Sequence, residues 1–548
     1  MSSQIRLAFR KNELGILAIL SVGFLVYSAA FIYRTSFIAI DSNRYYCLFD
    51  DAMISMRYAW NFTHGFGLTW NPGERIEGYS NLLMTFIMSF ATLLFTKAFA
   101  VLFIQVLGAV FMLSTAFMSM FIAGFVNERK DPKRLALIRI LVFIMTLAYY
   151  PLVYWSLMGM EVGLLTLLLL ASVLFSFNFI RDKTQINLYF VAVSLGLAFL
   201  TRNDSFIFSI PIWIYLFYES RNPVFSIKLK NKLFNAMALY LLFIVCQVVF
   251  RKLYYGVWFP NTYYLKLTGM PLLMRWENGI NYLGLFYNET GVLLIVPLVD
   301  LVFGYSKKKM VLAAIVALII LYQINIGGDA WLYWRMLSPI VPLIIILYIQ
   351  ASSTLVLTIT KSQAYRSYIL RNPIFPPLSI PGMLIILMSL ISFWPTGIRF
   401  YREATLFDRP YQSQQNKANV NVAIAINNLT SEDATVGVFW AGAIPYYTGR
   451  RAVDFLGKSD SYIAHLPVFI KRSGDWSDSA SVPGHNKFDL NYSIKSLQPT
   501  FVQAFVWRQQ DLTEWAATRY ASVEYYKGVL IYLLKDSPYV YWDKIQTK

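Results

Sequence analysis

Long apolar runs are the feature that most constrains what this chain can fold into. The first extends from Leu14 to about Tyr33, and others recur along the chain as far as Trp394. A helix needs about 20 mostly apolar residues to cross the hydrocarbon core of a bilayer. Only 14% of the residues are charged, whereas a soluble domain carries about 25%. The sequence therefore predicts a polytopic α-helical membrane protein.

The connectors between the apolar runs predict the orientation in the inner, cytoplasmic membrane. Lys and Arg collect in cytoplasmic loops, so NERKDPKR, RDKTQ and SKKK are expected inside. Residues 81–95 then form a juxtamembrane helix. About eleven transmembrane helices remain, with the N-terminus cytoplasmic and the C-terminal part extracytoplasmic. The expected spans are residues 14–33, 101–126, 135–156, 160–180, 186–201, 206–219, 233–250, 289–305, 310–325, 336–358 and 378–396. The net charge of +18 is attributed to these loops and indicates no nucleic-acid partner.

A polar loop interrupts this pattern directly after the first span. It covers residues 35–81 and ends in the segment DDAMISMRYAWNFTHGFGLTWNPGERIEGYSN, from Asp50 to Asn81. Its aromatic residues suit either stacking on sugar rings or ordinary anchoring at the membrane interface. Because this loop is polar between apolar neighbours, we expect the chemistry of the protein here.

The first residues of that segment combine acids and a base at helical spacing. Adjacent carboxylates repel, which raises the pKa of one and suits a proton acceptor or a cation ligand. In a helix, Asp50 and Arg57 share a face two turns apart, and Asp51 lies about 100° round it. Such an acid can accept a hydroxyl proton, and Arg can bind a phosphate through two parallel hydrogen bonds. The two aspartates can also hold Mg²⁺ or Ca²⁺ through oxygens, so the metal is left open and no cofactor is required.

Further candidates lie in the connectors expected outside the membrane. The ionisable ones are Glu161, Arg202, Lys266, Asp329 and Arg335. Charges at a membrane boundary are costly unless they are paired, so the alternative is that these residues form structural ion pairs between span ends. His64 and His485 also fall outside and are candidate binding residues, although the histidines are too dispersed for a metal motif.

After Trp394 the composition becomes that of a soluble domain. ANVNVAIAINNL predicts a helix, and ATVGVFW, RAVDFLG and PTFVQAFVW predict strands. SVEYYKGVLIYLLK predicts a hairpin that turns at Lys527 and Gly528. Alternating helices and strands predict a small α/β domain. We therefore divide the chain into a transmembrane domain, residues 1–396, and a soluble extracytoplasmic domain, residues 397–548.

The segment from Asp50 to Asn81 resembles the first-loop motif of GT-C-fold glycosyltransferases of the terminal arabinofuranosyltransferase type. That pattern runs DDAxIxxRYAxNxxxGxGLxxNPGERxEGYxN, and the match has no gaps. SLMGMEVGLL, TRNDSFIF, YYGVWFPNTYYLK and GGDAWLYWRMLSPIVPL resemble later motifs in the same order. AGAIPYYTGRRAVDFLGKSDSYIA and PGHNKFD in the tail do so too. The resemblance spans most of the chain.

The resemblance implies a fold, a reaction and a set of roles. Such enzymes transfer one sugar from a polyprenyl-phosphate carrier to an acceptor on the non-cytoplasmic face, with a first-loop acid as the base. Asp50 is then the first candidate for the base and Asp51 the second. Arg57, Arg202 and Arg335 become candidates for binding the donor phosphate. The other site candidates that it implies are Glu77, Tyr79, Asn81, Asn261 and Asp329.

Several alternatives stay open at this point. The sugar is arabinofuranose, another pentose or a hexose, and the acceptor is a cell-envelope glycan, a lipid-linked glycan or a protein. A membrane transporter is a rival, but it places charges at the bilayer midplane in two repeated halves. Here the charges cluster in connectors instead. A non-catalytic protein that binds the lipid carrier is the third reading.

Overall fold

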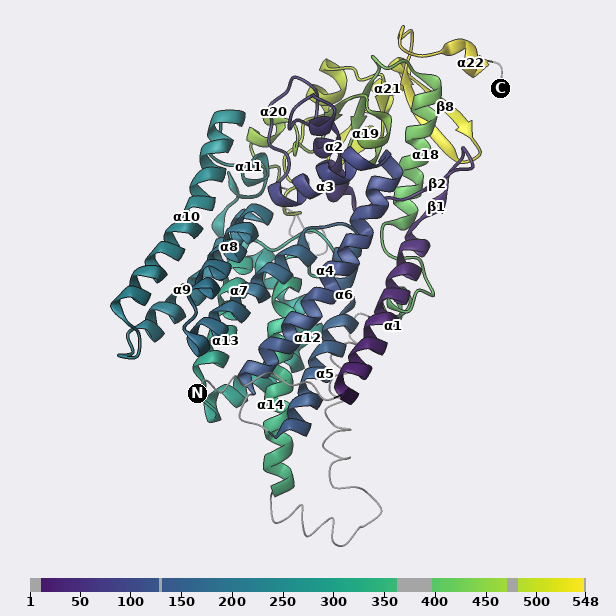
Figure 1. The fold of residues 1–548 in the computed structure, drawn as a ribbon. Coiled ribbons are helices and arrows are strands. Elements are labelled where there is room, and N and C mark those ends of the chain that lie inside the picture. The colour runs from purple at the N-terminus through teal and green to yellow at the C-terminus, as the bar shows by residue number, and fades with distance from the viewer. Residues whose placement is uncertain (1–10, 128–130, 362–396, 471–480, 547–548) are drawn as a thin grey trace.

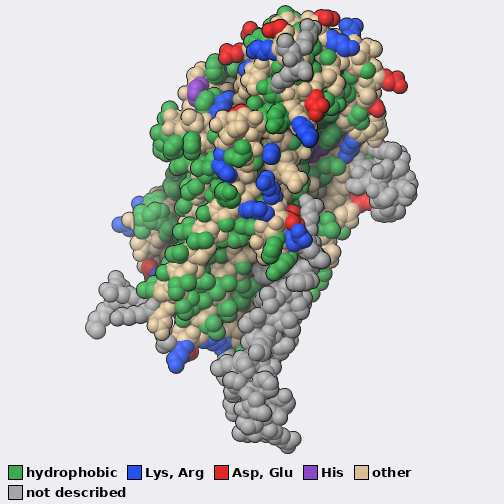
Figure 2. All heavy atoms as spheres, turned by 90° about the vertical axis from the view of Figure 1, so that its right-hand side faces the viewer, with side chains coloured by type: hydrophobic (Ala, Val, Ile, Leu, Met, Phe, Trp, Pro, Cys, Tyr) green, Lys and Arg blue, Asp and Glu red, His purple; other side chains and the backbone are tan. Residues whose placement is uncertain are grey.

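The computed structural model describes residues 11–127, 131–361, 397–470 and 481–546. The helices of the first 361 residues form a bundle, and a smaller α/β region covers one end of it (Figure 1). We call residues 397–546 the C-terminal region. On the face that Figure 2 shows, hydrophobic side chains predominate over the bundle, and Asp and Glu gather mainly at the end formed by the C-terminal region. This distribution fits a bundle in lipid and a region in water.

The bundle consists of apolar helices that overlap the predicted spans, although α12 (Leu272–Phe303) begins well before the predicted start at residue 289. Six described helices are long and apolar enough to cross a membrane, or up to eight if each of two bent pairs counts as one span. The bundle helices are α1 (Lys11–Thr35), α4 (Lys97–Val126), α5 (Pro132–Ala148), α6 (Tyr150–Leu157), α7 (Val162–Asp182), α8 (Gln185–Thr201), α9 (Phe206–Ser220), α10 (Ile227–Tyr255), α12 (Leu272–Phe303), α13 (Lys307–Ile326) and α14 (Val341–Lys361). The structure therefore confirms the predicted class of fold.

The number of crossings stays a prediction. Helices α8 and α9 have only 17 and 15 residues, which is shorter than the roughly 20 of a perpendicular span. Helices α5 and α6 together occupy the predicted span 135–156 and are bent by 56°. The last predicted span, 378–396, lies outside the described residues.

The polar loop between α1 and α4 folds over the end of the bundle. It contains helix α2 (Asp50–Thr63), as the sequence predicts, and is followed by helix α3 (Leu82–Leu94), which packs against α2. A short hairpin, β1 (Phe37–Ile38) and β2 (Arg44–Tyr45), precedes them. With 13 residues, α3 is shorter than a transmembrane helix and matches the juxtamembrane helix predicted over 81–95.

The C-terminal region has the mixed helices and strands that its sequence predicts. Its main sheet has the order β4-β3-β5-β9-β8, in which β3 runs parallel to β4 and β5 while β9 runs antiparallel to β5 and β8. The predicted hairpin turns at Lys527 and Gly528. The elements are α17 (Gly397–Ala404), α18 (Ser413–Leu429), β3 (Thr435–Val438), α19 (Ala443–Thr448), β4 (Arg451–Asp454), α20 (Ser461–His465), β5 (Phe501–Val502), β6 (Val506–Trp507), β7 (Gln510–Asp511), α21 (Thr513–Arg519), β8 (Tyr520–Tyr526), β9 (Val529–Leu534) and α22 (Trp542–Gln546).

Helix α2 joins this region to the bundle. A Cβ at Gly442 would lie 2.1 Å from the backbone oxygen of Asp50, so the close approach requires glycine. The indole N–H of Trp70 donates to the carbonyl of Ala441 at 3.2 Å. Buried side chains of α2, such as Met53, belong to the same apolar core as those of α19 and of the bundle. The polar loop and the C-terminal region thus pack as one unit.

The fold allows a direct test of orientation. Lys228 and Lys527 are both exposed, at the start of α10 and at the tip of the β8–β9 hairpin. Figure 1 places these two ends on opposite sides of the bundle. In a Cys246→Ser background, we expect a membrane-impermeant maleimide to label Lys527→Cys in intact cells or spheroplasts and Lys228→Cys only after permeabilisation, because basic connectors stay inside. The reverse pattern would invert the predicted topology. The remaining cysteine, Cys47, is buried.

Candidate active site

Asp50 faces the C-terminal region. Its side chain is 4% exposed, and its two oxygens accept hydrogen bonds from the backbone N–H groups of Gly442, at 3.1 Å, and Ala443, at 3.0 Å. Burial raises the pKa of Asp50 to about 7. The carboxylate therefore fastens α2 to the start of α19.

Arg57 lies on the same face of α2, as the i, i+7 spacing predicts. It is buried, and its guanidinium donates to the carbonyls of Trp70, Pro445 and Arg450 and to Asn71 Oδ1. These acceptors occupy the donors that a phosphate would use. The structure thus places Arg57 between the polar loop and the C-terminal region, away from the cavity described below, and does not support the predicted phosphate contact.

The position of Asp50 gives a pH-dependent stability. Because its pKa rises from an ordinary 3.8 to about 7 in the folded protein, the folded state binds this proton more tightly than the unfolded chain. This tighter proton binding stabilises the folded state fully below about pH 4, and the stabilisation is lost as the pH rises through about 7. We expect the thermal midpoint of the detergent-solubilised protein to fall over this interval. Asp50→Asn cannot ionise, so an unchanged slope in that variant would assign the effect to another group.

Asp51, about 100° further round α2, contacts two cationic side chains instead. Its Oδ2 lies 2.8 Å from Arg335 Nη1, and its Oδ1 accepts from Lys458 Nζ. Burial raises the pKa of Asp51, but Lys458 and Arg335 outweigh that effect and hold the pKa well below its usual range. Asp51 is therefore ionised at neutral pH and held between two cations.

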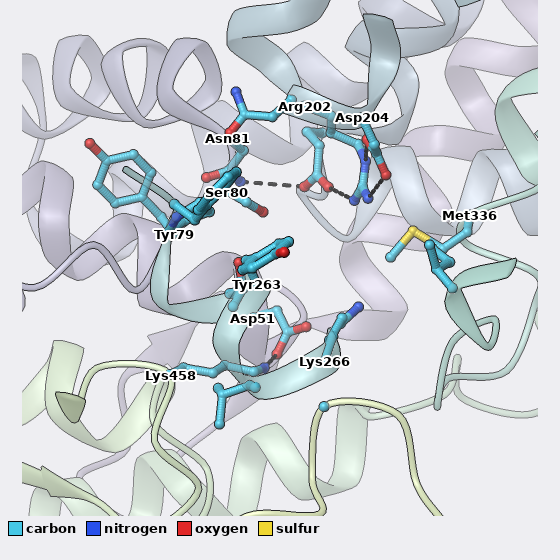
Figure 3. Close-up of a pocket in the computed structure, with 18 of the residues that line it drawn as sticks. Asp51, Tyr79, Ser80, Asn81, Arg202, Asp204, Tyr263, Lys266, Met336 and Lys458 are labelled. Carbon is cyan, nitrogen blue, oxygen red and sulfur yellow. Dashed lines mark hydrogen bonds and ion pairs between the residues drawn. The ribbon is translucent and has the colours of Figure 1, made fainter. Parts of the chain in front are cut away.

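Asp51 lies on the wall of a cavity of about 610 Å³ (Figure 3). One part of the wall carries ionisable groups from connectors distant in sequence. The basic ones are Arg202, Arg251, Lys266, Arg335 and Lys458, and the acidic ones are Asp51, Glu161, Asp204 and Asp329. The other part is apolar and comes from the ends of bundle helices α8, α9, α10 and α13 and from the segment before α11 (Asn261–Leu267), with Phe199, Phe206, Val248, Trp258, Phe259 and Ile326. A charged site thus adjoins an apolar one.

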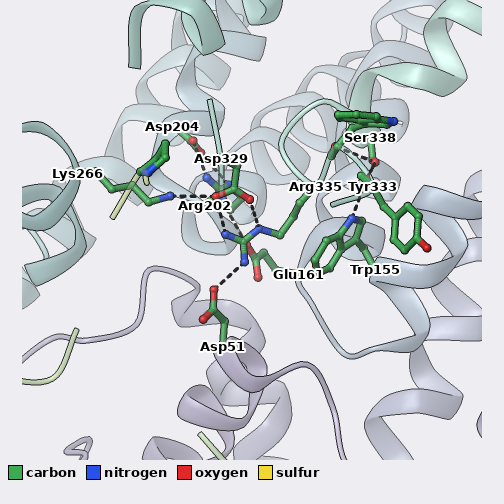
Figure 4. Close-up of polar contacts among 12 residues, drawn as sticks. Asp51, Trp155, Glu161, Arg202, Asp204, Lys266, Asp329, Tyr333, Arg335 and Ser338 are labelled. Carbon is green, nitrogen blue, oxygen red and sulfur yellow. Dashed lines mark hydrogen bonds and ion pairs between the residues drawn. The ribbon is translucent and has the colours of Figure 1, made fainter. Parts of the chain in front are cut away.

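Arg335 organises the charged part of the cavity (Figure 4). It donates to both oxygens of Asp329, at 2.9 and 3.0 Å, and to Asp51. Lys266 Nζ lies 3.5 Å from Asp329 Oδ1, which Arg335 already neutralises. Lys266 is therefore the cation with the weakest partner in this group.

A second ion-pair group continues the wall. Arg202 donates to Asp204 through Nε and Nη2, at 3.0 and 2.7 Å, and to Glu161 at 2.9 Å. Asn81 Nδ2 contacts the other oxygen of Glu161 at 3.3 Å. The predicted ionisable candidates thus meet at one place, and they also form the ion pairs of the alternative interpretation.

The connector before Arg335 has an unusual backbone. Tyr333 and Trp334 have φ values of 59° and 48°, which bulky residues rarely adopt. The indole N–H of Trp155 donates to the carbonyl of Tyr333 at 2.8 Å, and the Tyr333 hydroxyl donates to Glu403 at 2.7 Å. Such strain persists only where surrounding contacts impose it and is concentrated at functional sites.

Lys458 is a cavity residue that the sequence prediction missed. Asp454 accepts from the backbone N–H groups of Leu456, Gly457 and Ser459, which shapes the loop that carries Lys458. Asn261 Nδ2 donates to three carbonyls of the same loop, those of residues 457, 458 and 460. Asn261 thus positions Lys458 and does not itself line the cavity. The only sequence signal was the position of Lys458 within a tail segment of the family resemblance.

Of the remaining predicted site residues, some line the cavity and others do not. Glu77 is buried and forms a two-fold ion pair with Arg251, a cavity residue that was not selected from the sequence. Tyr79 and Asn81 line the cavity (Figure 3). His485 lines it too. His64 does not, because its exposed ring stacks on Trp60 with 3.9 Å between ring centroids.

Asp50 and Asp51 have different hydrogen-bonding partners in the structure. Asp50 binds backbone N–H groups and Asp51 binds cationic side chains. In the part of the chain that the structure describes, no group of three or more His, Cys, Asp or Glu side chains is placed to hold a metal ion.

Comparisons with known proteins identify the fold. A family described as "Domain of unknown function (DUF8728)" matches residues 404–528. No curated protein sequence matches the chain. Among solved structures, ArnT from Cupriavidus metallidurans bound to undecaprenyl phosphate is similar with a TM-score of 0.51 and 11% identity, over 80% of this chain and 85% of that one.

The apo oligosaccharyltransferase of Archaeoglobus fulgidus is similar with a TM-score of 0.52 and 13% identity. That match covers 98% of this chain and 76% of the other. The chain thus has the GT-C fold that the first-loop motif implied. The finer resemblance to terminal arabinofuranosyltransferases stays a prediction.

Proposed function

We propose that this protein transfers a single sugar from a polyprenyl-phosphate donor to a hydroxyl group of an acceptor at the extracytoplasmic face of the cytoplasmic membrane. The observation that carries this proposal is the cavity in which Asp51 and five basic side chains adjoin an apolar wall from the bundle helices. A lipid-linked sugar phosphate has the same division into a charged and an apolar part. The first-loop motif supports arabinofuranose, or a related pentose or hexose, as the sugar.

The donor phosphate binds at the charged part of the cavity. Arg335 and Lys458 contact Asp51 there, and Lys266 lies beside Asp329. Arg202 extends the basic wall. The polyprenyl chain follows the apolar wall, where Phe206, Trp258 and Phe259 are about half exposed. The fold likeness to a protein crystallised with undecaprenyl phosphate supports this assignment.

Asp51 is the general base in this mechanism. It accepts the proton of the acceptor hydroxyl while the hydroxyl oxygen forms a bond to the anomeric carbon. The bond from that carbon to the phosphate oxygen breaks, and its electron pair leaves with polyprenyl phosphate. The basic side chains stabilise the departing charge. One displacement of this kind inverts the anomeric centre.

Donor binding also activates the base. Without donor, the charges of Arg335 and Lys458 compensate the Asp51 carboxylate, which makes it a weak base. A phosphate placed between these cations competes for their hydrogen bonds, so the pKa of Asp51 rises toward neutrality. The carboxylate therefore gains basicity only when the sugar to be transferred is present.

Reconstitution of the purified protein with radiolabelled polyprenyl-phosphate sugars tests the function. Only a transferase converts the donor into free polyprenyl phosphate and a labelled product. A transporter moves label across the vesicle membrane without that release, and a carrier-binding protein only retains the lipid. A panel of arabinofuranose, other pentose and hexose donors identifies the sugar. Transport of intact donor without release would contradict the proposal.

Lys266→Met tests the donor site. Lys266 lines the cavity, and its ion-pair partner among the described residues, Asp329, is already neutralised by Arg335, so its charge is available to the phosphate. Hydrogen bonds to charged groups contribute about 1.5–3 kcal/mol, so we expect the affinity for polyprenyl phosphate to fall about 10- to 100-fold. The control is Lys535→Met, because Lys535 is exposed, donates to the carbonyls of Ala517 and Thr518 and lies outside the cavity lining. Equal affinities in both variants would remove Lys266 from the donor site.

A further inference from the structure

A second chamber, of about 210 Å³, adjoins the donor cavity, and Asp51 lines both. Asp51, Ile54, Trp331, Lys458 and His485 line both spaces, so these five residues form the wall between them. An atom held in the second chamber therefore reaches the same carboxylate that faces the donor. The mechanism above requires a place of this kind for the acceptor.

The chamber lies where parallel strands end. Phe439 and Trp440 follow β3 directly, Asp454 is the last residue of β4, and Trp507 follows β5 by a few residues. The chain crosses from β3 to β4 on one side and returns to β5 on the other side of β3. Ligands of open α/β sheets bind at the carboxyl ends of strands at such a reversal of strand order. The topology thus predicts a ligand site independently of Asp51.

Aromatic rings form much of the chamber wall. Trp331 and Trp440 have ring centroids 5.9 Å apart, and Phe439 stacks on Trp507 at 5.0 Å. Gln503 Oε1 accepts from the backbone N–H groups of Phe439 and Trp440, which fixes the turn that carries two of these rings. All four rings are partly exposed, so they offer flat apolar faces to a bound molecule.

The polar groups of the chamber are few, and most already have partners. Asp50 and Asp454 already accept backbone N–H groups, which use part of their hydrogen-bonding capacity. Among the described residues, the buried indole N–H of Trp507 has no acceptor. Burial lowers the pKa of His485 to about 4, so its ring is neutral. If Nδ1 donates to the nearby carbonyl of Pro483 at 3.2 Å, Nε2 is an acceptor. A ligand thus meets the indole donor of Trp507 and the imidazole acceptor of His485 beside Asp51.

We propose that this chamber binds the sugar ring that receives the transferred sugar, and hence that the acceptor is a glycan and not a polypeptide. This inference rests on the proposed function. A sugar ring has an apolar C–H face for the indoles and several hydroxyls that both donate and accept. The volume is below the about 300–1,000 Å³ of typical ligand pockets, which suits one terminal ring. A bound extended peptide also needs partners for its own backbone N–H and C=O groups, and the described lining supplies few.

The test uses the full-length protein in lipid nanodiscs with two acceptor panels. One panel contains methyl glycosides and short oligosaccharides of pentoses and hexoses, and the other contains short peptides with Ser, Thr or Asn. We expect transfer to a member of the first panel. In Trp440→Ala and Trp507→Ala, the acceptor KM should rise about tenfold, as expected for a lost aromatic contact, with donor affinity unchanged. Trp440→Phe should restore most of it, because a phenyl ring keeps the apolar contact. Trp515→Ala, in α21 outside both cavities, is the control.

A binding measurement separates failure of this inference from failure of the proposed function. Saturation-transfer NMR reports whether the same methyl glycosides bind to wild type and to the Trp440→Ala/Trp507→Ala variant, whether or not turnover occurs. Glycoside binding that the variant loses supports the chamber even if no donor is consumed. Transfer to peptides alone contradicts the glycan acceptor while the transferase stands. Glycoside binding or transfer that is equal in wild type, the chamber variants and the control contradicts the chamber, as does the absence of binding to wild type.

Discussion

Asp51→Asn is expected to lower turnover by about 10²- to 10⁴-fold, the usual contribution of a general base. The amide keeps the size of the side chain but cannot accept a proton at neutral pH. Affinity for polyprenyl phosphate should stay the same or increase, because Arg335 and Lys458 lose their anionic partner. Single-turnover kinetics with preformed donor complex and separate donor titrations measure the two effects.

Asp50→Asn is the matched control for that variant. Asp50 is the adjacent residue, but its oxygens bind the backbone of Gly442 and Ala443. We expect less than a tenfold loss of turnover together with the altered pH dependence of stability described above. If Asp50→Asn alone is inactive, the base is the other member of the pair. Normal turnover in both variants would make the first-loop carboxylates structural.

The sequence predicts the helices and strands of the site better than it predicts which side of each one lies at the cavity. The periodicity of the first-loop motif predicts α2 and places Asp50 and Arg57 on one face, and the structure has both on one face. Which face meets the cavity depends on the C-terminal region, because Asp50 contacts Gly442 and Asp51 contacts Lys458 about 400 residues later in the chain. Two adjacent residues with the same chemistry cannot be separated by local pattern. We therefore propose Asp51 in place of Asp50 as the general base only because the fold shows their different contacts.

The roles of the charged residues in the connectors also cannot be decided from the sequence alone. Composition predicts that Glu161, Arg202 and Arg335 are either site residues or structural ion pairs. In the structure they are paired and also line the cavity, so the two alternatives describe the same arrangement. Lys458 had no comparable signal, since a single lysine in a polar region is ordinary. Its role follows from Asp454 and Asn261, which shape its loop from different parts of the chain.

Arg335→Gln is expected to produce the largest loss of stability. Arg335 is 6% exposed and neutralises Asp329, which is 1% exposed, as well as Asp51. Removing one partner of a buried ion pair leaves an uncompensated charge and costs about 3–5 kcal/mol. The free energy of unfolding can be measured by titrating mixed micelles with SDS. Activity should also fall steeply, because Asp51 and the donor phosphate lose a cation that both use.

A double-mutant cycle with Asp329→Asn identifies the cause of that loss. If buried charge is responsible, adding Asp329→Asn to Arg335→Gln should recover part of the stability, since the neutral amide no longer needs a cation. Activity should not recover with it, because the donor phosphate still lacks Arg335. The control is Arg402→Gln, which breaks an exposed pair with Asp408 of the same two-fold geometry. Exposed pairs contribute little to stability, so the SDS midpoint of that variant should stay close to that of wild type. Equal losses of stability in Arg335→Gln and Arg402→Gln would show that burial does not increase the contribution of the Arg335 pair.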